Sequence, residues 1–373
     1  MNILVLGGTG AMGRPLVQEL SKEHTVFVTS RKPHPSTGSV RYILGNAKDL
    51  TFLEQALTER HYDAIVDFMV WTTEFEAVLP MLLQNTDQYV FISSARVYSQ
   101  SEEPITESTP RLLDVSDDQI YLRTNEYALA KAREEDLLRK SGSKNYTIIR
   151  PSITYNTHRL QLGVFEKEAW LYRVLHGRSI VFSDDIADKL TTMTLGDDVA
   201  KGIASIVGQD SAIGETFHIT YPTSLLWSDV LHVYLQVLEK HLGRKVNVVM
   251  TKKCTNLLFP ARIYQVIYCR YFNRTFDNSK IGQYCDVSKF TAPEEGLVQC
   301  LQRFLDSPSF SGIDWSLEAL NDKAANEKTP ISEIPGIGSK VFYLLYRYDL
   351  QWAEHLLRPL FKIKGKLKSI IHK

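Results

Sequence analysis

The feature that most constrains the fold of this chain is a glycine-rich turn placed directly after its first apolar segment. Residues 2–6 form a nearly continuous apolar run, which is typical of a strand buried on both faces. Gly7, Gly10 and Gly13 follow at GxxGxxG spacing, and residues 14–20 have the pattern of a helix start. Gly7 permits a tight turn, Gly10 lets backbone N–H groups approach a pyrophosphate, and Gly13 lets helix and strand pack closely. The pattern therefore predicts a strand–turn–helix unit that binds a dinucleotide.

Strand and helix patterns alternate through the first half of the chain. Helical spacing appears at residues 49–58 and 121–140, and further strand-like runs occupy residues 25–29, 40–44, 64–67, 88–92 and 146–149. Such alternation predicts an α/β fold with a Rossmann-type, doubly wound parallel sheet. After Pro151 the pattern loosens, and beyond Pro260 it is mostly helical.

The predicted domains are interwoven along the chain. Residues 1–155, with a return segment at about 191–220, form the dinucleotide-binding Rossmann domain. Residues 156–190 and 221–300 form a smaller substrate-binding part, and residues 301–373 form a helical C-terminal extension with a basic tail. Within that extension the polar stretch 321–329 is predicted to be a surface linker.

The end of the second predicted strand indicates which cofactor is bound. An NAD site places a carboxylate there for the ribose 2′-hydroxyl, whereas this chain has Ser30, Arg31 and Lys32. Two cations and a hydroxyl suit a 2′-phosphate, so we expect NADP(H) in preference to NAD(H). A solvated basic loop is the alternative. Asn46, after the third strand, is a candidate for the adenine edge or an ordinary turn residue.

A second group of residues has the spacing of a proton-transfer site. Ser94 closes the fifth strand at the sheet edge where ligands bind. Tyr127 and Lys131 follow at i,i+4 spacing, which puts the phenol and the ammonium on one helix face. Lys131 would lower the pKa of Tyr127, and Ser94 would hydrogen-bond the same substrate oxygen.

These motifs together resemble the extended short-chain dehydrogenase/reductases, in the epimerase/dehydratase branch, over about residues 1–300. The matching segments are GGTGAMG, SSARVY, ITESTP, YALAK, IIRPS, GDDVA, GETFHIT and, more loosely, FDNSK. The resemblance implies a nicotinamide cofactor and a nucleotide-activated sugar as substrate. It also implies that Ser94, Tyr127 and Lys131 are the catalytic triad. The cofactor residues that it implies, beyond the glycines, are Thr9, Met12, Phe68, Met69, Pro151 and Ile153.

Departures from the family pattern narrow the expected chemistry. Ala95 and Arg96 replace the Asp-Glu pair that dehydratases use to remove water, so dehydration is not expected. Ile153 replaces an asparagine that contacts substrate in sugar epimerases, and Asn156 stands where glycine is usual. The loop between residues 110 and 121 is also enlarged.

Several basic residues are candidates for the substrate's diphosphate, because guanidinium and ammonium groups pair well with phosphate. They are His158, Arg159, Arg178 and Lys189. Arg96 is a further candidate for a substrate anion, and its alternative is an ion pair with Glu107. Each of these residues is also compatible with an ordinary solvated surface charge.

The net charge of zero conceals an uneven distribution of charged residues along the chain. The chain has 43 basic and 43 acidic residues, yet residues 339–373 hold eight basic residues and two acidic ones. Within it, residues 356–373 alternate apolar and basic residues and suit a weak contact with an anionic membrane surface, and a soluble tail or a homodimer contact are the alternatives. Residues 334–340 resemble a helix-hairpin-helix turn but lack an evident upstream helix, so no nucleic-acid partner is expected.

The four cysteines have no metal-ligand spacing, and no signal peptide or spanning segment is evident. We therefore expect reduced thiols, no metal, and a cytoplasmic protein that is at most peripheral to the membrane. The leading hypothesis is an NADPH-dependent oxidoreductase that reduces a keto group on a nucleotide-activated sugar or ketose for surface polysaccharide synthesis. The alternatives are a nucleotide-sugar epimerase that recycles its cofactor, and a non-catalytic dinucleotide-binding sensor or scaffold.

Overall fold

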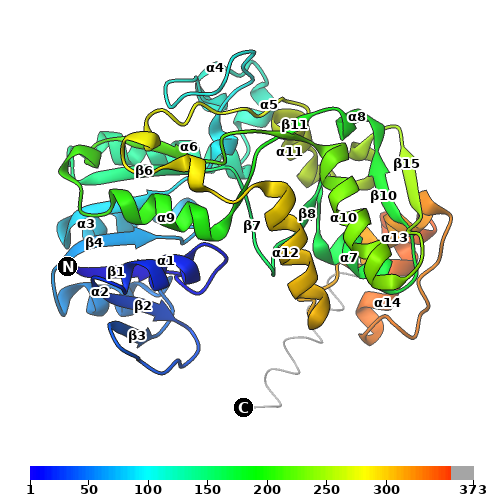
Figure 1. Ribbon diagram of the computed structural model, residues 1–373, viewed down its shortest axis with the longest axis horizontal. Helices are drawn as coiled ribbons and strands as arrows, with labels where there is room; N and C mark the ends of the chain where they lie inside the picture. Colours follow the sequence, from blue (N-terminus) through cyan, green and yellow to red (C-terminus); the bar gives the residue numbers. More distant parts are fainter. Residues whose placement is uncertain (354–373) are drawn as a thin grey trace.

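The computed structural model, which describes residues 1–353, contains a seven-stranded parallel sheet built mainly from the N-terminal half of the chain (Figure 1). Its strand order is β13-β6-β5-β4-β1-β2-β3, and every pair is parallel. The bounds are β1 (Asn2–Leu6), β2 (Thr25–Ser30), β3 (Val40–Leu44), β4 (Tyr62–Asp67), β5 (Thr86–Ile92), β6 (Tyr146–Pro151) and β13 (Thr216–Ile219). The predicted Rossmann-type sheet is confirmed.

Helices cover both faces of this sheet. Successive residues of β1 point to opposite faces, so Ile3 and Val5 pack under α1 (Gly13–Leu20) and α9 (Gly196–Ile206). Leu4 and Leu6 face the other way. There they pack in one cluster with residues of α2 (Leu50–Thr58), α3 (Phe75–Gln84) and α6 (Tyr127–Lys140). Because both faces are covered, β1 is apolar and buried from Ile3 to Leu6.

A second body, beside the sheet in Figure 1, has its own large apolar core. Its main helices are α7 (Lys167–Leu175), α10 (Trp227–Leu242) and α12 (Pro293–Asp306). The short pairs are β7 (Ile153–Tyr155) with β12 (Met193–Leu195), β8 (Gln161–Leu162) with β9 (Phe165–Glu166), β10 (Ile180–Ser183) with β15 (Val248–Thr251), and β11 (Leu190–Thr191) with β14 (Leu225–Leu226). Two short helices, α8 (Asp184–Ala187) and α11 (Ile263–Gln265), complete it.

The enlarged loop carries two short helices, α4 (Leu112–Val115) and α5 (Gln119–Leu122). Tyr121 is buried and stacks on Tyr268, with ring centroids 4.2 Å apart. The Tyr268 hydroxyl donates to Asp118 Oδ2 at 2.7 Å. These contacts tie the loop to the second body across a large separation in sequence.

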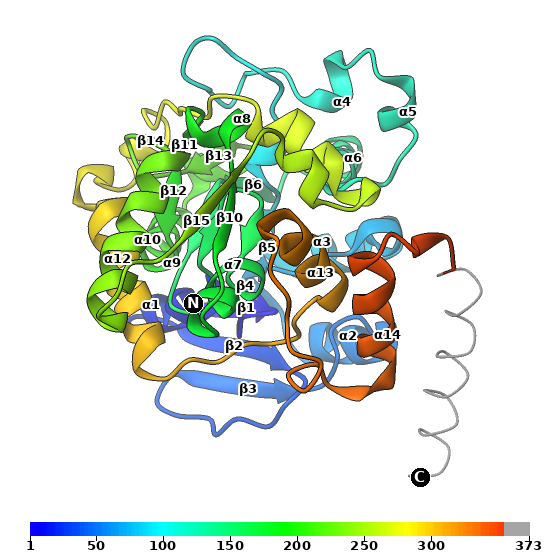
Figure 2. The same ribbon diagram turned by 90° about the vertical axis from the view of Figure 1, so that its right-hand side faces the viewer.

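The C-terminal extension packs onto this second body through α13 (Trp315–Ala325) and α14 (Gly336–Arg347), as Figure 2 shows. Arg173 is fully buried, and it contacts Glu318 at 2.7 Å, Asp322 at 2.8 Å and Glu327 at 2.7 Å. Arg178 contacts Glu318 and Glu333, each at 3.1 Å. A network of buried charges therefore joins the extension to α7 and the residues that follow it.

Two expectations for the extension are corrected. Residues 321–329 were predicted to be a surface linker, but Asn321 and Asp322 lie in α13 and Thr329 is buried. Arg173 and the hydroxyl of Tyr343 hold Asp322 inside, which composition alone does not reveal. The segment 334–340, predicted to lack an upstream helix, has one: its residues 336–340 begin α14, and α13 precedes it and packs against α14.

No helix in residues 1–353 is long and apolar enough to cross a membrane. Most of the basic tail, including residues 356–373, lies outside the described residues, so the membrane and dimer expectations stay predictions.

Removing one partner of a buried ion pair leaves the other charge uncompensated, at a cost of about 3–5 kcal/mol. We expect Arg173→Met to lower the free energy of unfolding by about this amount, because Glu318 and Asp322 would lose their cation. Denaturant unfolding measures the change.

The matched control is Lys323→Met, which breaks the exposed pair between Lys323 and Asp349. Exposed pairs contribute little, so this variant should unfold at nearly the wild-type denaturant concentration. Equal effects of the two substitutions would contradict a structural role for the buried network.

Candidate functional site

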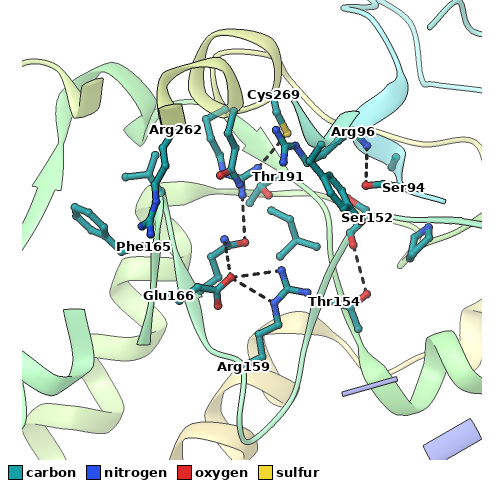
Figure 3. A pocket seen from close by; sticks show the side chains of 18 of the residues that line it. Ser94, Arg96, Ser152, Thr154, Arg159, Phe165, Glu166, Thr191, Arg262 and Cys269 are labelled. Atoms are coloured by element: carbon teal, nitrogen blue, oxygen red, sulfur yellow. Dashed lines mark hydrogen bonds and ion pairs between the residues drawn. The ribbon is translucent and has the colours of Figure 1, made fainter. Parts of the chain in front are cut away.

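A cavity of about 740 Å³ lies at the carboxyl ends of the central strands and extends into the second body. Met12, Met69, Ser94, Tyr127 and Lys131 line it from the Rossmann side. The second body contributes residues of β9, α7 and the segment 262–276, and Figure 3 shows 18 of the lining side chains. The two interwoven parts of the chain therefore share one cavity.

The glycine turn has the geometry that a dinucleotide needs. Gly7 has a φ of +72°, which favours glycine, and Gly13 starts α1 so close to the turn that a Cβ there would lie 2.6 Å from Gly8 Cα. Gly10 differs, because a Cβ at this position would have only the Gly7 carbonyl oxygen within 4 Å, at 3.8 Å. Open space at Gly10 and the start of α1 fit a pyrophosphate held by backbone N–H groups.

The loop after β4 forms the neighbouring wall. Phe68 and Met69 line the cavity, and a Cβ on Gly7 would lie 3.3 Å from Met69 Sδ. Asp67 is buried beneath this loop and accepts hydrogen bonds from the Met69 N–H at 2.8 Å and Trp71 Nε1 at 2.6 Å. Burial raises the pKa of Asp67. These bonds fix the loop against the glycine turn.

The end of β2 carries the predicted cofactor-selecting residues. Ser30 is buried and accepts a hydrogen bond from the Lys32 N–H at 3.2 Å. Arg31 and Lys32 are exposed, and neither takes part in an ion pair within residues 1–353. Asn46 is exposed as well, and its Oδ1 accepts from the Lys48 N–H at 3.2 Å, which is the bond of a turn residue.

Ser94, Tyr127 and Lys131 reach the same cavity from two elements. Ser94 follows β5, and its Oγ accepts the Arg96 N–H at 3.2 Å. Tyr127 is the first residue of α6, and Lys131 lies one turn later. The expected single helix over residues 121–140 is interrupted here, because the Glu126 carboxylate caps α6 by accepting the Ala128 N–H at 2.8 Å.

Glu134 is a partner of Lys131 that sequence reasoning missed. Lys131 is only 2% exposed, and its Nζ lies 2.9 Å from Glu134 Oε2 and 4.5 Å from the centre of the Phe91 ring. Glu134 Oε1 accepts the N–H of Thr72 at 2.8 Å, and Thr72 has a φ of +57°. The i,i+3 spacing of Lys131 and Glu134 was the available signal.

The adjacent Glu135 anchors α6 to the sheet. Its carboxylate accepts from Ser93 Oγ at 2.6 Å and from Arg150 Nε and Nη2 at 2.8 and 2.6 Å. Burial raises the pKa of Glu135, but the bonds from Arg150 and Ser93 outweigh it, so the pKa lies below its usual value. Ser93 and Arg150 directly precede Ser94 and Pro151, which both line the cavity.

Only part of the predicted substrate set faces the cavity. Arg159 lines it and lies 3.4 Å from Glu166 Oε1. Arg96 also lines it, and its ion-pair partner is Glu126; the alternative of a pair with Glu107 was wrong. Glu107 instead accepts the N–H of His218 at 3.1 Å.

The remaining three candidates are not among the residues that line the cavity. Arg178 is buried in the ion network of the extension, where it pairs with Glu318 and Glu333 and does not line the cavity. Lys189 lies 3.6 Å from Asp188 Oδ1, and the backbone N–H of His158 donates to Asn156 Oδ1 at 2.8 Å. The positions of these three residues depend on the fold of the second body, and the sequence there has little of the apolar periodicity that predicts helices and strands.

Sequence reasoning also missed two buried arginines on the cavity wall. Arg270 and Arg274 are 3% and 5% exposed, and their hydrogen bonds go to uncharged partners. Burial lowers the pKa of both guanidiniums. Burial raises the pKa of the neighbouring Cys269 thiol, but the two arginines outweigh it and lower the pKa overall. Arg270 Nη1 also donates to Cys269 Sγ at 3.0 Å. Within residues 1–353, neither arginine has a carboxylate partner in an ion pair.

The four cysteines are free, and no cluster of potential metal ligands occurs within residues 1–353.

Comparisons with known proteins agree with this geometry. A family model described as NAD(P)H-binding matches residues 7–192. A curated relative from Arabidopsis thaliana, the chloroplast stem-loop binding protein of 41 kDa b, is 26% identical over 237 residues. That match covers 58% of this chain and 58% of the relative, so the chain spans less than two thirds of the relative's length.

Solved structures share the fold over most of the chain. The UDP-glucuronic acid 4-epimerase from Bacillus cereus, in complex with UDP-glucuronic acid and NAD, is 18% identical with a TM-score of 0.58, covering 82% of this chain and 100% of its own. The dTDP-glucose 4,6-dehydratase from Bacillus anthracis, in complex with NAD, is 17% identical with a TM-score of 0.59, covering 82% and 97%. An epimerase from Methanothermobacter thermautotrophicus is 17% identical with a TM-score of 0.62, covering 82% and 92%.

Two glycine variants separate folding from cofactor binding. We expect Gly10→Ala to leave the free energy of unfolding within about 0.5 kcal/mol of wild type, since the added methyl group meets open space. The same variant should raise the dissociation constant of the dinucleotide about tenfold or more, because the methyl group would occupy the pyrophosphate's position. Cofactor titration by fluorescence measures this change.

Gly13→Ala is the matched comparison. Its Cβ would collide with the Gly8 backbone, so we expect a loss of about 1–3 kcal/mol of stability. Unchanged cofactor affinity in Gly10→Ala would contradict this placement of the pyrophosphate.

Proposed function

We propose that this chain, an NAD(P)H-binding protein with the Rossmann fold of nucleotide-sugar epimerases and dehydratases, is an NADPH-dependent oxidoreductase that reduces a keto group on a nucleotide-activated sugar or ketose. The observation that carries this proposal is the shared cavity. It joins the glycine-turn side, the three residues Ser94, Tyr127 and Lys131, and two buried arginines that pair with no carboxylate of residues 1–353.

Each residue of the triad has a separate task in the proposed reaction. When bound, a reduced nicotinamide would supply the hydride for the carbonyl carbon. Tyr127 donates its phenolic proton to the carbonyl oxygen, so that the ketone becomes an alcohol, and solvent then returns a proton to Tyr127. Ser94 Oγ hydrogen-bonds the same oxygen. Lys131 supplies a positive charge one turn below the phenolate, and Glu134 holds that ammonium in place.

The buried arginines support a diphosphate-bearing substrate. Arg270 and Arg274 lie on the cavity wall, and neither forms an ion pair with a carboxylate of residues 1–353. Isolated buried cations are costly, so an anionic ligand would relieve that cost on binding. Guanidinium groups also match phosphate oxygens in a bidentate geometry. Nucleotide-activated sugars contain such a diphosphate, and polysaccharide precursor synthesis is the setting that we propose.

Arg31 and Lys32 support NADPH as the reductant. They are exposed at the end of β2, where the adenosine ribose lies in this fold, and no carboxylate of the described chain pairs with them. A cofactor that is consumed in each turnover suits net reduction. An epimerase that recycles its cofactor is the second candidate, favoured by the epimerases among the structural neighbours.

We favour small-molecule chemistry over a binding role without catalysis. The curated relative is named for stem-loop binding, but a cavity of about 740 Å³ has the size of a small-ligand site. A binding module also needs no proton donor, and Tyr127 lies on the wall of that cavity.

A tyrosine variant tests the proton donor. With a substrate identified by screening nucleotide-linked keto sugars with NADPH, Tyr127→Phe should lower kcat by about 10²–10⁴-fold. Its dissociation constant for NADPH should stay close to wild type, since the proposed role of the removed hydroxyl is proton donation to the substrate.

The matched control is Tyr284→Phe, which removes a hydroxyl that donates to Ser211 at 2.9 Å and lies outside the cavity lining. This variant should retain wild-type kcat. Full activity of Tyr127→Phe would refute the assignment.

A double variant tests the cofactor preference. Arg31→Ala with Lys32→Ala should raise the dissociation constant for NADPH at least about tenfold and leave that for NADH nearly unchanged, because only NADPH carries the 2′-phosphate. Lys289→Ala is an exposed control far from β2 in sequence. Tighter binding of NADH than NADPH by the wild-type protein would reject this preference.

A further inference from the structure

The start of the C-terminal extension forms part of the cavity wall. Ser311, Gly312, Asp314 and Leu317 all line the cavity. They follow α12, and the last two belong to the N-cap and first turn of α13. The extension therefore contributes residues to the same cavity that the Rossmann domain lines.

This wall lies at the end of the cavity remote from the triad. Arg262, in the 3₁₀ turn Pro260–Arg262, pairs with Asp314 through Nη2 and Oδ2 at 3.5 Å. Figure 3 shows Arg262 and Phe165 on the side opposite Ser94, with Cys269 between them. The pair joins the second body to the extension across that end of the cavity.

The wall is held in a fixed position. Asp314 Oδ1 caps α13 by accepting the N–H of Leu317 at 3.2 Å, and Leu317 is part of the main core of the second body. Glu318, the residue after Leu317, accepts hydrogen bonds from the guanidinium groups of Arg173 and Arg178. Because buried charges and core packing both anchor α13, its first turn is a rigid boundary for a ligand.

The order of groups along the cavity indicates what this end would contact. Ser94 and Tyr127 define the position of the reacting carbonyl. Arg270 lines the cavity and is the sequence neighbour of Cys269, which Figure 3 shows between Ser94 and Arg262. With the sugar at the triad and the diphosphate at the arginines, the nucleoside is the part of the substrate that remains. It extends toward Arg262 and Asp314.

We propose that residues 311–317, together with Arg262, form the nucleoside-binding wall and select among nucleotide bases, an inference that rests on the proposed function for its substrate class. Arg262 and Asp314 offer a donor and an acceptor for base or ribose edges, and Phe165 offers an apolar face. The extension is then a specificity element of the site.

The test measures binding of UDP, TDP, GDP, ADP and CDP to the full-length protein saturated with NADPH, by isothermal titration calorimetry. Asp314→Asn keeps a side chain that caps helices well but removes the charge, and Arg262→Gln removes the other charge. Each variant should change the affinity for the preferred nucleoside diphosphate about tenfold or alter the order of preference. Inorganic pyrophosphate should bind each variant as it binds wild type, because it reaches only the arginines.

Asp349→Asn is the matched control, since it removes an exposed charge of the same extension that pairs with Lys323 outside the cavity lining. It should bind every ligand as wild type does. Binding by wild type with unchanged profiles in both cavity variants would overturn the nucleoside wall and leave the proposed function standing. Failure of wild type to bind any of the five diphosphates would overturn the proposed substrate class, and this inference with it.

Discussion

The carboxylate of Glu135 joins the three elements that carry the proposed proton-transfer residues. It lies on α6 between Ser93 of the β5 end and Arg150 of β6, and it accepts hydrogen bonds from both. Glu135 is fully buried, so these bonds are shielded from water and the acid is held in its charged form. Tyr127 and Lys131 on α6, Ser94 after β5 and Pro151 at the end of β6 thus take their relative positions from one buried ion pair. Moving any of the three elements would separate the triad from the cavity wall.

A second set of buried charges fixes the elements at the other end of the cavity. Arg173 and Arg178 bind the carboxylates of Glu318, Asp322, Glu327 and Glu333. The extension is thereby part of the second body, and its first residues reach the cavity. One wall of the site depends on Glu135 and the opposite wall on Arg173. Arg270 and Arg274, which pair with no carboxylate in the described part of the chain, lie on the cavity wall as well, where an anionic ligand would balance their charge.

The Rossmann-type sheet and the placement of the glycine turn, Tyr127 and Lys131 could be predicted from the sequence, because the patterns that indicate them each span only a few residues. The glycine spacing, the apolar strands and the i,i+4 pair of Tyr127 and Lys131 each depend on neighbours a few residues apart. Arg178 illustrates why the rest could not be predicted, since its partners Glu318 and Glu333 are 140 and 155 residues away. The surface-linker expectation for residues 321–329 failed for the same reason. Arg270 and Arg274 carry no local sequence pattern, and only the fold shows that they line the cavity with no ion pair to a carboxylate of residues 1–353.

The central claim is that hydride passes from NADPH to a sugar carbonyl while Tyr127 supplies the proton. Turnover with NADPH deuterated at the transferred C4 position, followed by mass spectrometry of the sugar product, tests it directly. The account predicts one deuterium in each product molecule and one NADP⁺ formed for each sugar converted. Conversion of the sugar with no deuterium gained and no net oxidation of NADPH would contradict it and would identify the protein as an epimerase.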